Sequence, residues 1–347
     1  MVAMPNGTRT ETRTRKRHLW IDGLVALVAV ASVSWLSHTN AQTTTGSAPP
    51  VTVKAASGLP LTSIFTRGYQ LFAEFVRKES KDRVTITYVG GPEVFPPYAL
   101  VDSVKSGVIQ IAATPCNWYS PLVPETLAIK LSDFPPWELR ERGAYKVLDE
   151  AHAKSKLKLV AWDGWGAPFR IWLNKRIDRP DLKGLKLRVT GAHQAFIEAL
   201  GGAAVSIAPP EIYPAMERGV IDGYGWPAVG INEFKWQEVT KFVVAQGYYV
   251  VEDCIVANLD FWQTLDPAQR DAINRAAVLM EREMSDVFKR VLAEQDADNQ
   301  KRGLTFIRFS SDETKKFVEM ANRVGWEEVL KKAPNYGLRL KQLMSRH

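Results

Sequence analysis

The chain has few of the residues and motifs that small-molecule enzymes use for catalysis or metal binding; a lone S-x-x-K match at Ser155–Lys158 lacks its companion motifs. It holds only two cysteines in 347 residues. It has no C-x-x-C pair and no Cys/His cluster at zinc spacing, which excludes a disulfide-stapled miniature fold and argues against a structural zinc site. The H-E-x-x-H, G-x-S-x-G, P-loop and G-x-G-x-x-G motifs are also absent. Zinc proteases, serine hydrolases and the common nucleotide-binding enzymes therefore drop out as candidate functions.

Histidine is equally scarce, with five in the chain. Two of them fall in the first 41 residues and one is the last residue, which leaves His152 and His193 for acid–base chemistry. Neither lies in a recognisable catalytic arrangement. An exported hydrolase or isomerase that uses Glu93, His193 or Cys116 stays open as an alternative to a binding function without catalysis.

The chain lacks a run of basic residues outside its beginning. The net charge is +7, and residues 1–41 carry +3 of it, so the remainder keeps only +4, scattered along the sequence. This mild charge without a basic helix argues against a nucleic-acid partner.

The beginning of the chain has the pattern of a secretory signal peptide. Four basic residues within 13–17 precede the apolar run 24–36, which is too short to span a membrane, and small polar residues follow. We expect residues 1–41 to be removed before Gln42 and the protein to reside in the periplasm. An uncleaved anchor is the alternative, because the apolar stretch reaches 18 residues when it is extended back to Leu19.

The rest of the chain has an ordinary globular composition, with 46% hydrophobic and 24% charged residues, and is long enough for two α/β lobes. Val51–Ala55 and Val84–Val89 have the pattern of strands, and residues 60–80 between them have that of an amphipathic helix. This β-α-β unit predicts a parallel sheet.

The same junction between a helix and a strand, which we call the repeated joint, occurs twice in the sequence. Residues 105–110 and 217–222 each contain a helix end, a glycine (Gly107 and Gly219) and a Val-Ile pair that is expected to begin a buried strand. The two copies indicate two similarly built lobes, although chance similarity is the alternative.

The second half predicts further strands and one long helix. Strands are expected at 157–162, 169–174 and 185–189, a helix at 193–200, and one long strand at 243–256 that runs between the lobes. Asp266 and Pro267 form a good helix start, and the apolar spacing continues to Gly303, or roughly 54 Å of helix. This helix is expected to brace both lobes, with a coiled-coil partner helix as the alternative. The predicted organisation is 42–160 for lobe I, 161–250 for lobe II and 251–347 for the crossing strand and bracing helices.

The two cysteines, Cys116 and Cys254, have three open roles: a thiol nucleophile, a disulfide or two inert core residues. Export permits a disulfide, but sequence spacing alone does not establish one.

An ordered set of motifs resembles the DctP-type solute-binding proteins of tripartite ATP-independent periplasmic (TRAP) transporters. The motifs are the segments 183–189, 200–203, 211–213 and 219–223, together with Gly107-Val108-Ile109 and Asp266-Pro267. The resemblance implies an α/β fold of the type II-like periplasmic binding proteins, with two lobes and a ligand cleft between them. It also implies a small organic acid anion as ligand, TRAP membrane subunits as partners, no cofactor and no catalysis. A receptor for an ATP-driven importer or for a signalling protein is the alternative.

The resemblance also implies particular binding residues. In that family the arginine that corresponds to Arg188 pairs with the carboxylate of the ligand, and the one that corresponds to Arg170 often assists. A guanidinium suits this role because it binds a carboxylate through two hydrogen bonds and keeps its charge. Trp226 stands where many members have an asparagine, which favours a 2-oxo, 2-hydroxy or aromatic monocarboxylate over a sugar acid. A dicarboxylate stays open through Arg170.

Other candidates are weaker. Trp118, Trp165 and Tyr248 are expected to line the cleft, with ordinary core packing as the alternative. Glu93 and Gly91 are expected to contact the ligand, Glu93 by receiving a hydroxyl or a cation, with a solvated loop carboxylate as the alternative. No protein metal site is expected, but a cation bound together with the ligand stays open.

Overall fold

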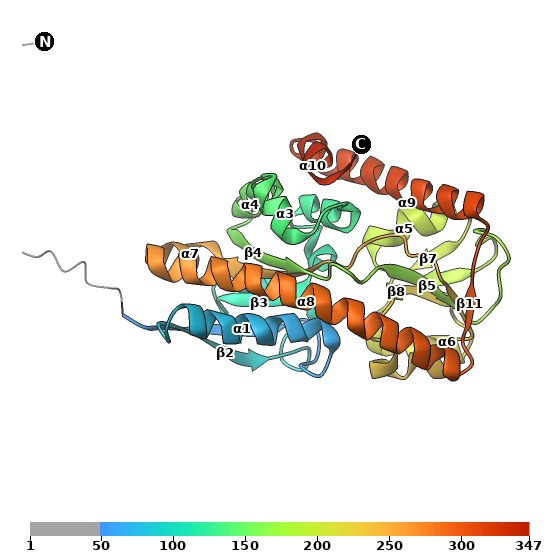
Figure 1. The fold of residues 1–347 in the computed structure, drawn as a ribbon, viewed down its shortest axis with the longest axis horizontal. Helices are drawn as coiled ribbons and strands as arrows, with labels where there is room; N and C mark the ends of the chain where they lie inside the picture. Colours follow the sequence, from blue (N-terminus) through green and yellow to red (C-terminus); the bar gives the residue numbers. More distant parts are fainter. Residues whose placement is uncertain (1–48, 347) are drawn as a thin grey trace, which may run out of the picture. The chain divides into compact units, whose positions relative to one another are not determined.

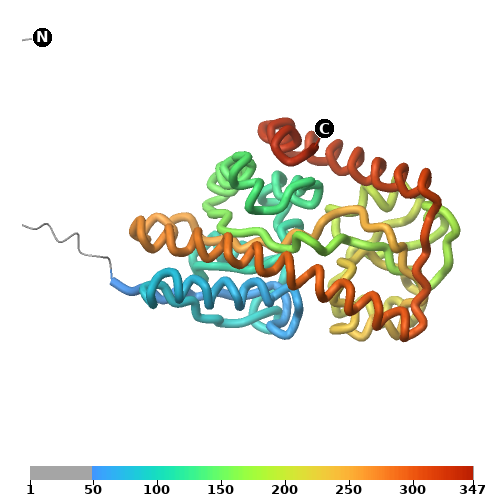
Figure 2. Tube along the Cα trace, viewed as in Figure 1, coloured from blue at the N-terminus to red at the C-terminus, as the bar shows by residue number. Residues whose placement is uncertain are grey.

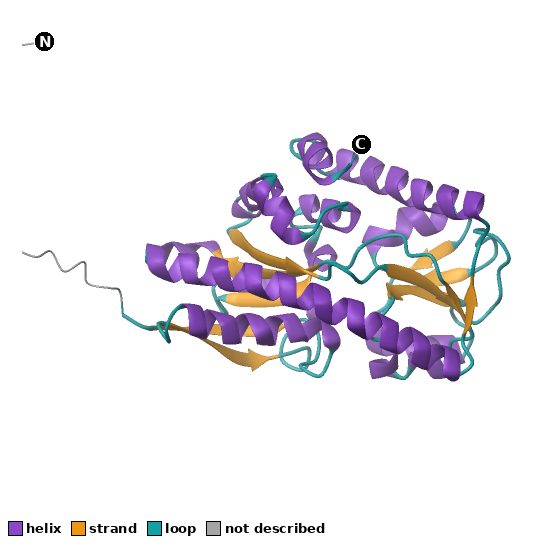
Figure 3. Ribbon diagram, viewed as in Figure 1, coloured by secondary structure: helices purple, strands orange, loops and turns teal. Residues whose placement is uncertain are grey.

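The computed structural model describes residues 49–346, which form two β-sheets with helices packed around them (Figures 1 and 3). The predicted signal peptide lies outside the described residues. We call the part of the chain around the first sheet lobe I and the part around the second sheet lobe II. In spatial order the first sheet contains β2 (Val84–Gly90), β1 (Val51–Ser57), β3 (Ile111–Pro115), β10 (Asp253–Asn258) and β4 (Leu157–Asp163). The second contains β11 (Thr305–Ile307), β9 (Phe242–Val244), β5 (Phe169–Leu173), β8 (Gly223–Pro227), β6 (Lys186–Arg188) and β7 (Ala203–Val205).

The helices connect these strands along the chain. They are α1 (Arg67–Glu79), α2 (Leu100–Lys105), α3 (Pro136–Glu141), α4 (Ala144–Ala153), α5 (Gly191–Ala199), α6 (Ile212–Glu217), α7 (Leu259–Thr264), α8 (Pro267–Lys301), α9 (Ser311–Lys332) and α10 (Gly337–Met344). Short 3-10 helices include η1 (Ile64–Thr66), η3 (Cys116–Tyr119) and η4 (Pro124–Leu131). No helix in residues 49–346 is long and apolar enough to cross a bilayer.

Lobe I begins with the predicted β-α-β unit. Strand β1 pairs in parallel with both β2 and β3, and the buried face of α1 includes Leu71, Phe72 and Val76. Strand β10 returns from lobe II and inserts antiparallel between β3 and β4. The prediction of a parallel crossover is therefore confirmed for β1 and β2.

The repeated helix-glycine joint precedes one strand in each sheet, β3 in the first and β8 in the second. Gly107 follows α2 with φ +79° and Gly219 follows α6 with φ +68°, the left-handed conformation expected there. The next residue, Val108 or Val220, is 62% or 56% exposed, whereas Ile109 and Ile221 are each 1% exposed. The strands β3 and β8 start two residues after the isoleucine, so the Val-Ile pair does not begin them. Only the isoleucine of each pair is buried in the core.

Two segments connect the lobes side by side (Figure 2). Residues 164–168 lead from β4 to β5, and residues 245–252 lead back from β9 to β10. They are joined by a bridge between Pro168 and Val250 and by the bond from the Phe169 amide to the Tyr249 carbonyl, 2.8 Å. The expectation of one strand over 243–256 is wrong, because the chain leaves one sheet and joins the other within that range.

The long helix α8 contacts both lobes, as predicted (Figure 1). It starts with the Asp266 side chain accepting a bond from the Gln269 amide, 2.7 Å, and packs on α1 and β4. In its second half Gln295 accepts a bond from the Gly230 amide, 2.8 Å, and Asp298 one from Asn232, 3.1 Å. The apolar stripe is therefore buried within this chain, and a coiled-coil partner is not needed. Strand β11, which follows α8 at the edge of the second sheet, was not expected.

Cys116 and Cys254 form a disulfide with a Cα–Cα distance of 5.2 Å. This settles the choice among the three roles that the sequence left open. The bond links the segment after β3 to β10, and both residues are fully buried. It holds together two segments that are 138 residues apart in sequence.

We expect removal of this disulfide by the double change Cys116→Ser and Cys254→Ser to lower the free energy of unfolding by about 2–5 kcal/mol, because the bond restricts the unfolded chain. Urea denaturation without reductant measures the difference. Dithiothreitol should lower the stability of the native protein to that of the double variant and should leave the variant unchanged. Equal stability of the two proteins under oxidising conditions would contradict the prediction.

Candidate functional site

A cavity lies between the two lobes. The space between the protein atoms there is about 430 Å³, a figure that includes open solvent. Lobe I, lobe II and the returning segment 245–252 with the start of β10 all contribute to the lining. The polar and aromatic lining residues include Asn117, Trp118, Arg188, His193, Trp226, Glu252 and Asp253.

Arg188 supplies positive charge to this cavity. It ends β6 and is 1% exposed. Its Nε donates to the Ile207 carbonyl, 2.9 Å, whereas Nη2 has no hydrogen-bond partner. Burial lowers the pKa of Arg188, and contact with Tyr98 opposes this effect, yet a guanidinium stays charged in a protein. A buried cation with an unused donor is costly unless an anion binds to it.

Trp226 forms a wall beside this charge. The guanidinium carbon of Arg188 lies 5.6 Å from the centre of the Trp226 ring. The indole also meets Phe65 of lobe I edge to face, with 6.1 Å between ring centres, so the contact crosses the cavity from one lobe to the other. Its Nε1 has no partner. The site thus combines a planar apolar wall with a free N–H donor.

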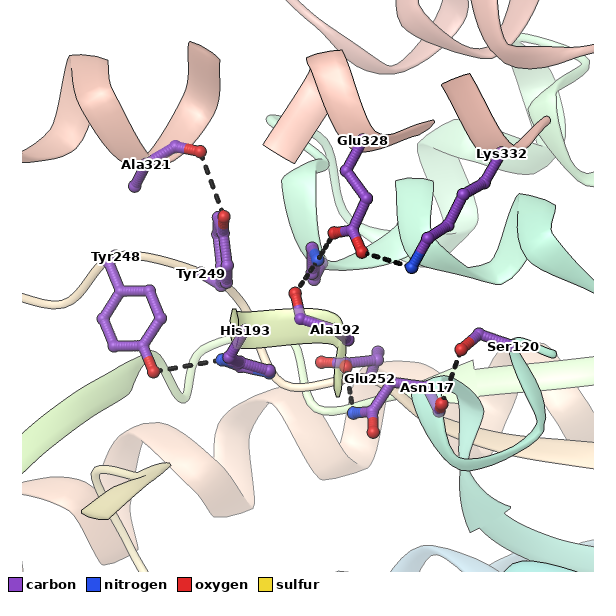
Figure 4. Close-up of polar contacts among 11 residues, drawn as sticks. Asn117, Ser120, Ala192, His193, Tyr248, Tyr249, Glu252, Ala321, Glu328 and Lys332 are labelled. Carbon is purple, nitrogen blue, oxygen red and sulfur yellow. Dashed lines mark hydrogen bonds and ion pairs between the residues drawn. The ribbon is translucent and has the colours of Figure 1, made fainter. Parts of the chain in front are cut away.

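His193 lies on α5 and faces the same cavity. Its Nδ1 is 3.0 Å from the Tyr248 hydroxyl, as Figure 4 shows, and its Nε2 has no partner. Burial holds the pKa of His193 well below its usual range, and Lys130 and Arg188 lower it further. This histidine is therefore neutral at physiological pH.

Glu252 brings a carboxylate into the cavity. Its Oε1 accepts a bond from the Asn117 side chain, 2.5 Å (Figure 4), and its Oε2 has no partner. Burial raises the pKa of Glu252 to about 7, while the bond from Asn117 and the charge of Lys130 oppose the shift. Lys130 itself pairs with Glu328, 3.1 Å, and also donates to the Ala192 carbonyl.

The structure brings together only part of the predicted set. Arg188, Trp226 and Trp118 line the cavity. Trp118 packs against Tyr98 of lobe I, with 5.0 Å between ring centres. Tyr248 stands behind His193 rather than in the lining.

Besides Tyr248, four predicted residues lie outside the lining: Arg170, Trp165, Glu93 and Gly91. Arg170 forms two bonds of 2.6 and 3.0 Å to Asp296 of α8, so its guanidinium is already used by a carboxylate of the chain itself. Trp165 packs edge to face on Trp162. Glu93 accepts a bond from the Gly91 amide, 2.6 Å, and so stabilises its own turn instead of the cavity.

Several lining residues were missed by the sequence analysis, among them Asn117, Thr190, Glu252 and Asp253. The sequence did contain one pattern that points to two of these residues. Glu252 and Asp253 are adjacent carboxylates inside the apolar run 250–256, and charges are rarely buried in such a run without a purpose. In residues 49–346 no group of three or more His, Cys, Asp or Glu side chains could hold a metal ion.

A cavity between two α/β lobes, with a buried guanidinium and aromatic walls, is typical of a ligand-binding receptor. The chain belongs to the DctP family, described as bacterial extracellular solute-binding protein, family 7, whose model matches residues 56–332. This family is one of receptors, and the fold expected from the resemblance is confirmed.

Relatives share modest identity with the chain. An uncharacterized protein y4mM of Sinorhizobium fredii is 29% identical over 253 residues, 68% of this chain but only 43% of that protein. The C4-dicarboxylate-binding periplasmic protein DctP of Rhodobacter capsulatus is 23% identical over 298 residues, 82% of this chain and 85% of the relative. The crystal structure of a TRAP periplasmic solute-binding protein from Ralstonia eutropha H16 with bound (S)-2-acetolactate superposes with a TM-score of 0.73. The two are 22% identical, over 85% of this chain and 99% of that one.

The raised pKa of Glu252 predicts a pH dependence of stability. The folded protein keeps a proton on Glu252 up to about pH 7, whereas the unfolded chain releases it near 4.5. The free energy of unfolding should therefore fall as the pH rises from about 4.5 to about 7, by on the order of 3 kcal/mol for this group.

Urea denaturation of the ligand-free protein at pH 5 and pH 8 measures this fall. The variant Glu252→Gln keeps the shape and the bond from Asn117 but does not titrate, so its loss of stability between the two pH values should be smaller. Asp163 and Asp253, whose pKa values burial also raises, titrate in both proteins; because Glu252 raises the pKa of Asp253 further, the difference between the two proteins includes this coupling. The same pH dependence in both proteins would contradict the assignment to Glu252.

Proposed function

We propose that this protein is the periplasmic receptor of a TRAP transporter, that it binds a small monocarboxylate between its lobes, and that it delivers the ligand to the membrane subunits. The observation that carries this proposal is the unused Nη2 of the buried Arg188, which faces the cavity beside Trp226. Family membership and the acids named for the relatives from Rhodobacter and Ralstonia support it.

Binding follows from the charges in the cavity. A carboxylate that enters accepts hydrogen bonds from Arg188 in an environment with little water, where charge-assisted bonds are strong. The lobes move about the adjacent connecting segments 164–168 and 245–252, and closure brings Phe65 of lobe I against Trp226 of lobe II. The ligand thus stabilises the closed arrangement, which is the form that the membrane subunits recognise.

A single carboxylate is favoured over two. Arg170 is occupied by Asp296 and Lys130 by Glu328, so neither has a free charge for a second acid group. The walls formed by Phe65, Trp118 and Trp226 suit an apolar or planar substituent. A 2-oxo, 2-hydroxy or aromatic acid fits this combination.

The alternative of an exported hydrolase or isomerase loses two of its three proposed groups. Cys116 is held in the disulfide and has no free thiol, and Glu93 is bonded to its own turn, whereas His193 does line the cavity. A buried disulfide also agrees with an oxidising compartment such as the periplasm.

We expect Arg188→Ala to weaken binding of the ligand by thirtyfold or more, because truncating one member of a buried charge pair costs roughly 2–5 kcal/mol. The ligand is first identified by mass spectrometry after release from freshly purified protein, and its affinity for both proteins is then measured by calorimetry.

Arg170→Ala is the matched control, since it removes a buried guanidinium that does not line the cavity. It should lower the melting temperature through loss of the pair with Asp296 while keeping the affinity within about threefold. Circular dichroism checks that both variants are folded. Unchanged affinity in a folded Arg188→Ala protein would remove Arg188 from the site and refute the proposed binding mode.

A further inference from the structure

Several residues that line the cavity hold polar atoms without partners. On the lobe II side, Arg188 Nη2 and Trp226 Nε1 are donors, and the Thr190 hydroxyl and His193 Nε2 also have no partner. On the side of lobe I and the start of β10, Asn117 Oδ1, Glu252 Oε2 and Asp253 Oδ2 are acceptors. The cavity therefore has a side with the cationic donor Arg188 and an acceptor end with acidic groups, and a well-matched ligand carries the opposite charges.

The acceptor end continues into an adjoining cavity that shares Leu59, Phe65, Pro115 and Asp253 with the first. Asp163 lines it directly opposite Asp253 in the antiparallel pairing of β4 and β10. Asp163 Oδ1 has no partner. Two carboxylates in this position repel one another unless a proton or a cation lies between them.

A further side chain points to a ligand at this end. Thr114 is 3% exposed and lines the adjoining cavity, and its Oγ1 has no hydrogen-bond partner. It is not part of the acidic group, and its hydroxyl oxygen is an additional acceptor for an incoming N–H group.

No cation among residues 49–346 pairs directly with these acids, although the charge of Lys130 acts on Glu252. None of Asp163, Glu252 and Asp253 forms an ion pair within residues 49–346, because the buried cations nearby pair elsewhere: Arg140 with Glu281 and Lys130 with Glu328. A buried acid without a partner keeps its proton, because burial disfavours its charged form. A positively charged group of the ligand would let these acids ionise and would pair with them.

We infer, on the basis of the proposed function, that the cleft is built for a zwitterion, with the ligand's carboxylate on Arg188 and its ammonium group at the acceptor end formed by Asn117, Glu252, Asp253, Asp163 and Thr114. The ligand class is a small amino acid with an apolar or aromatic side chain, which packs against Phe65, Trp118 and Trp226. An ammonium offers three N–H donors to this end, whereas a 2-hydroxy group offers one and a 2-oxo group none. The inference thus replaces the 2-oxo or 2-hydroxy acid by its 2-amino counterpart.

The acidic side chains around the acceptor end predict a second measurable effect of an ammonium ligand, the release of protons. Asp163 faces Asp253 and Glu281 of α8, Asp253 faces Glu252, and Glu252 faces Asn117 with Lys130 nearby. Burial raises the pKa of all three acids, so an ammonium that binds among them displaces protons into the buffer. An uncharged hydroxyl or keto group displaces none.

The test compares matched ligands on the wild-type protein. Thermal shift is measured with the apolar and aromatic L-amino acids and with the 2-hydroxy and 2-oxo acids of the same side chains. Members that stabilise the protein are then measured by calorimetry in two buffers of different ionisation enthalpy. We expect an amino acid to bind at least tenfold tighter than its oxo and hydroxy counterparts and to release protons. Tighter binding of an oxo or hydroxy acid overturns the inference but leaves the proposed function intact, and failure of every carboxylate refutes both.

Variants separate the two ends of the cavity. Asp253→Asn keeps the side-chain shape, removes the charge and should weaken amino-acid binding at least tenfold while changing oxo-acid binding little. If the Asp253→Asn protein does not fold, Asp163→Asn is measured in its place. Asp286→Asn, 75% exposed on α8, is the matched control and should bind as wild type does. Unchanged amino-acid affinity in a folded Asp253→Asn protein would overturn the inference, and Arg188→Ala should weaken all three ligand classes alike.

Discussion

The binding site depends on one buried positive charge that the chain itself does not neutralise. Arg188 is held in place by the bond from Nε to the Ile207 carbonyl, by contact with Tyr98 and by the face of Trp226, and its Nη2 has no partner. The other buried arginine discussed above, Arg170, is paired with Asp296. The difference between the two is a carboxylate of the chain within reach: Arg170 has one, whereas Arg188 keeps a donor without a partner in a residue that lines the cavity.

The surrounding framework keeps this charge buried and connects the two lobes. Helix α8 contacts both lobes, and helix α9 packs on η4 in lobe I and on α5 in lobe II. Tyr249 in the returning segment donates to the Ala321 carbonyl of α9, 3.1 Å (Figure 4). The disulfide between Cys116 and Cys254 attaches the segment that carries Asn117 and Trp118 to β10, next to Glu252 and Asp253. The disulfide thus holds Asn117 close to Glu252 and Asp253, three residues of the acceptor end.

The sequence correctly predicted helix ends and helix starts, which depend on residues that are close together in the chain. Glycines 107 and 219 marked helix ends because only a residue without a side chain takes a positive φ at low cost. Asp266 and Pro267 marked the start of α8 because capping requires only neighbouring residues. The segment 243–256 was misjudged because its β-branched and aromatic residues are shared by two strands in different sheets, and residue propensity does not say where a chain changes sheets.

The sequence by itself determined that the chain has two α/β lobes, a long bracing helix and an arginine at position 188 in a motif that resembles carboxylate receptors. Only the tertiary structure decided which arginine is free, that the two cysteines are bonded, and that Asp163 meets Asp253 beside the cavity. The physical reason is that helix caps and turns are set by residues close in sequence. Ion pairing, burial and the sharing of a cavity depend on residues 90 to 140 positions apart, such as Arg170 with Asp296 and Cys116 with Cys254.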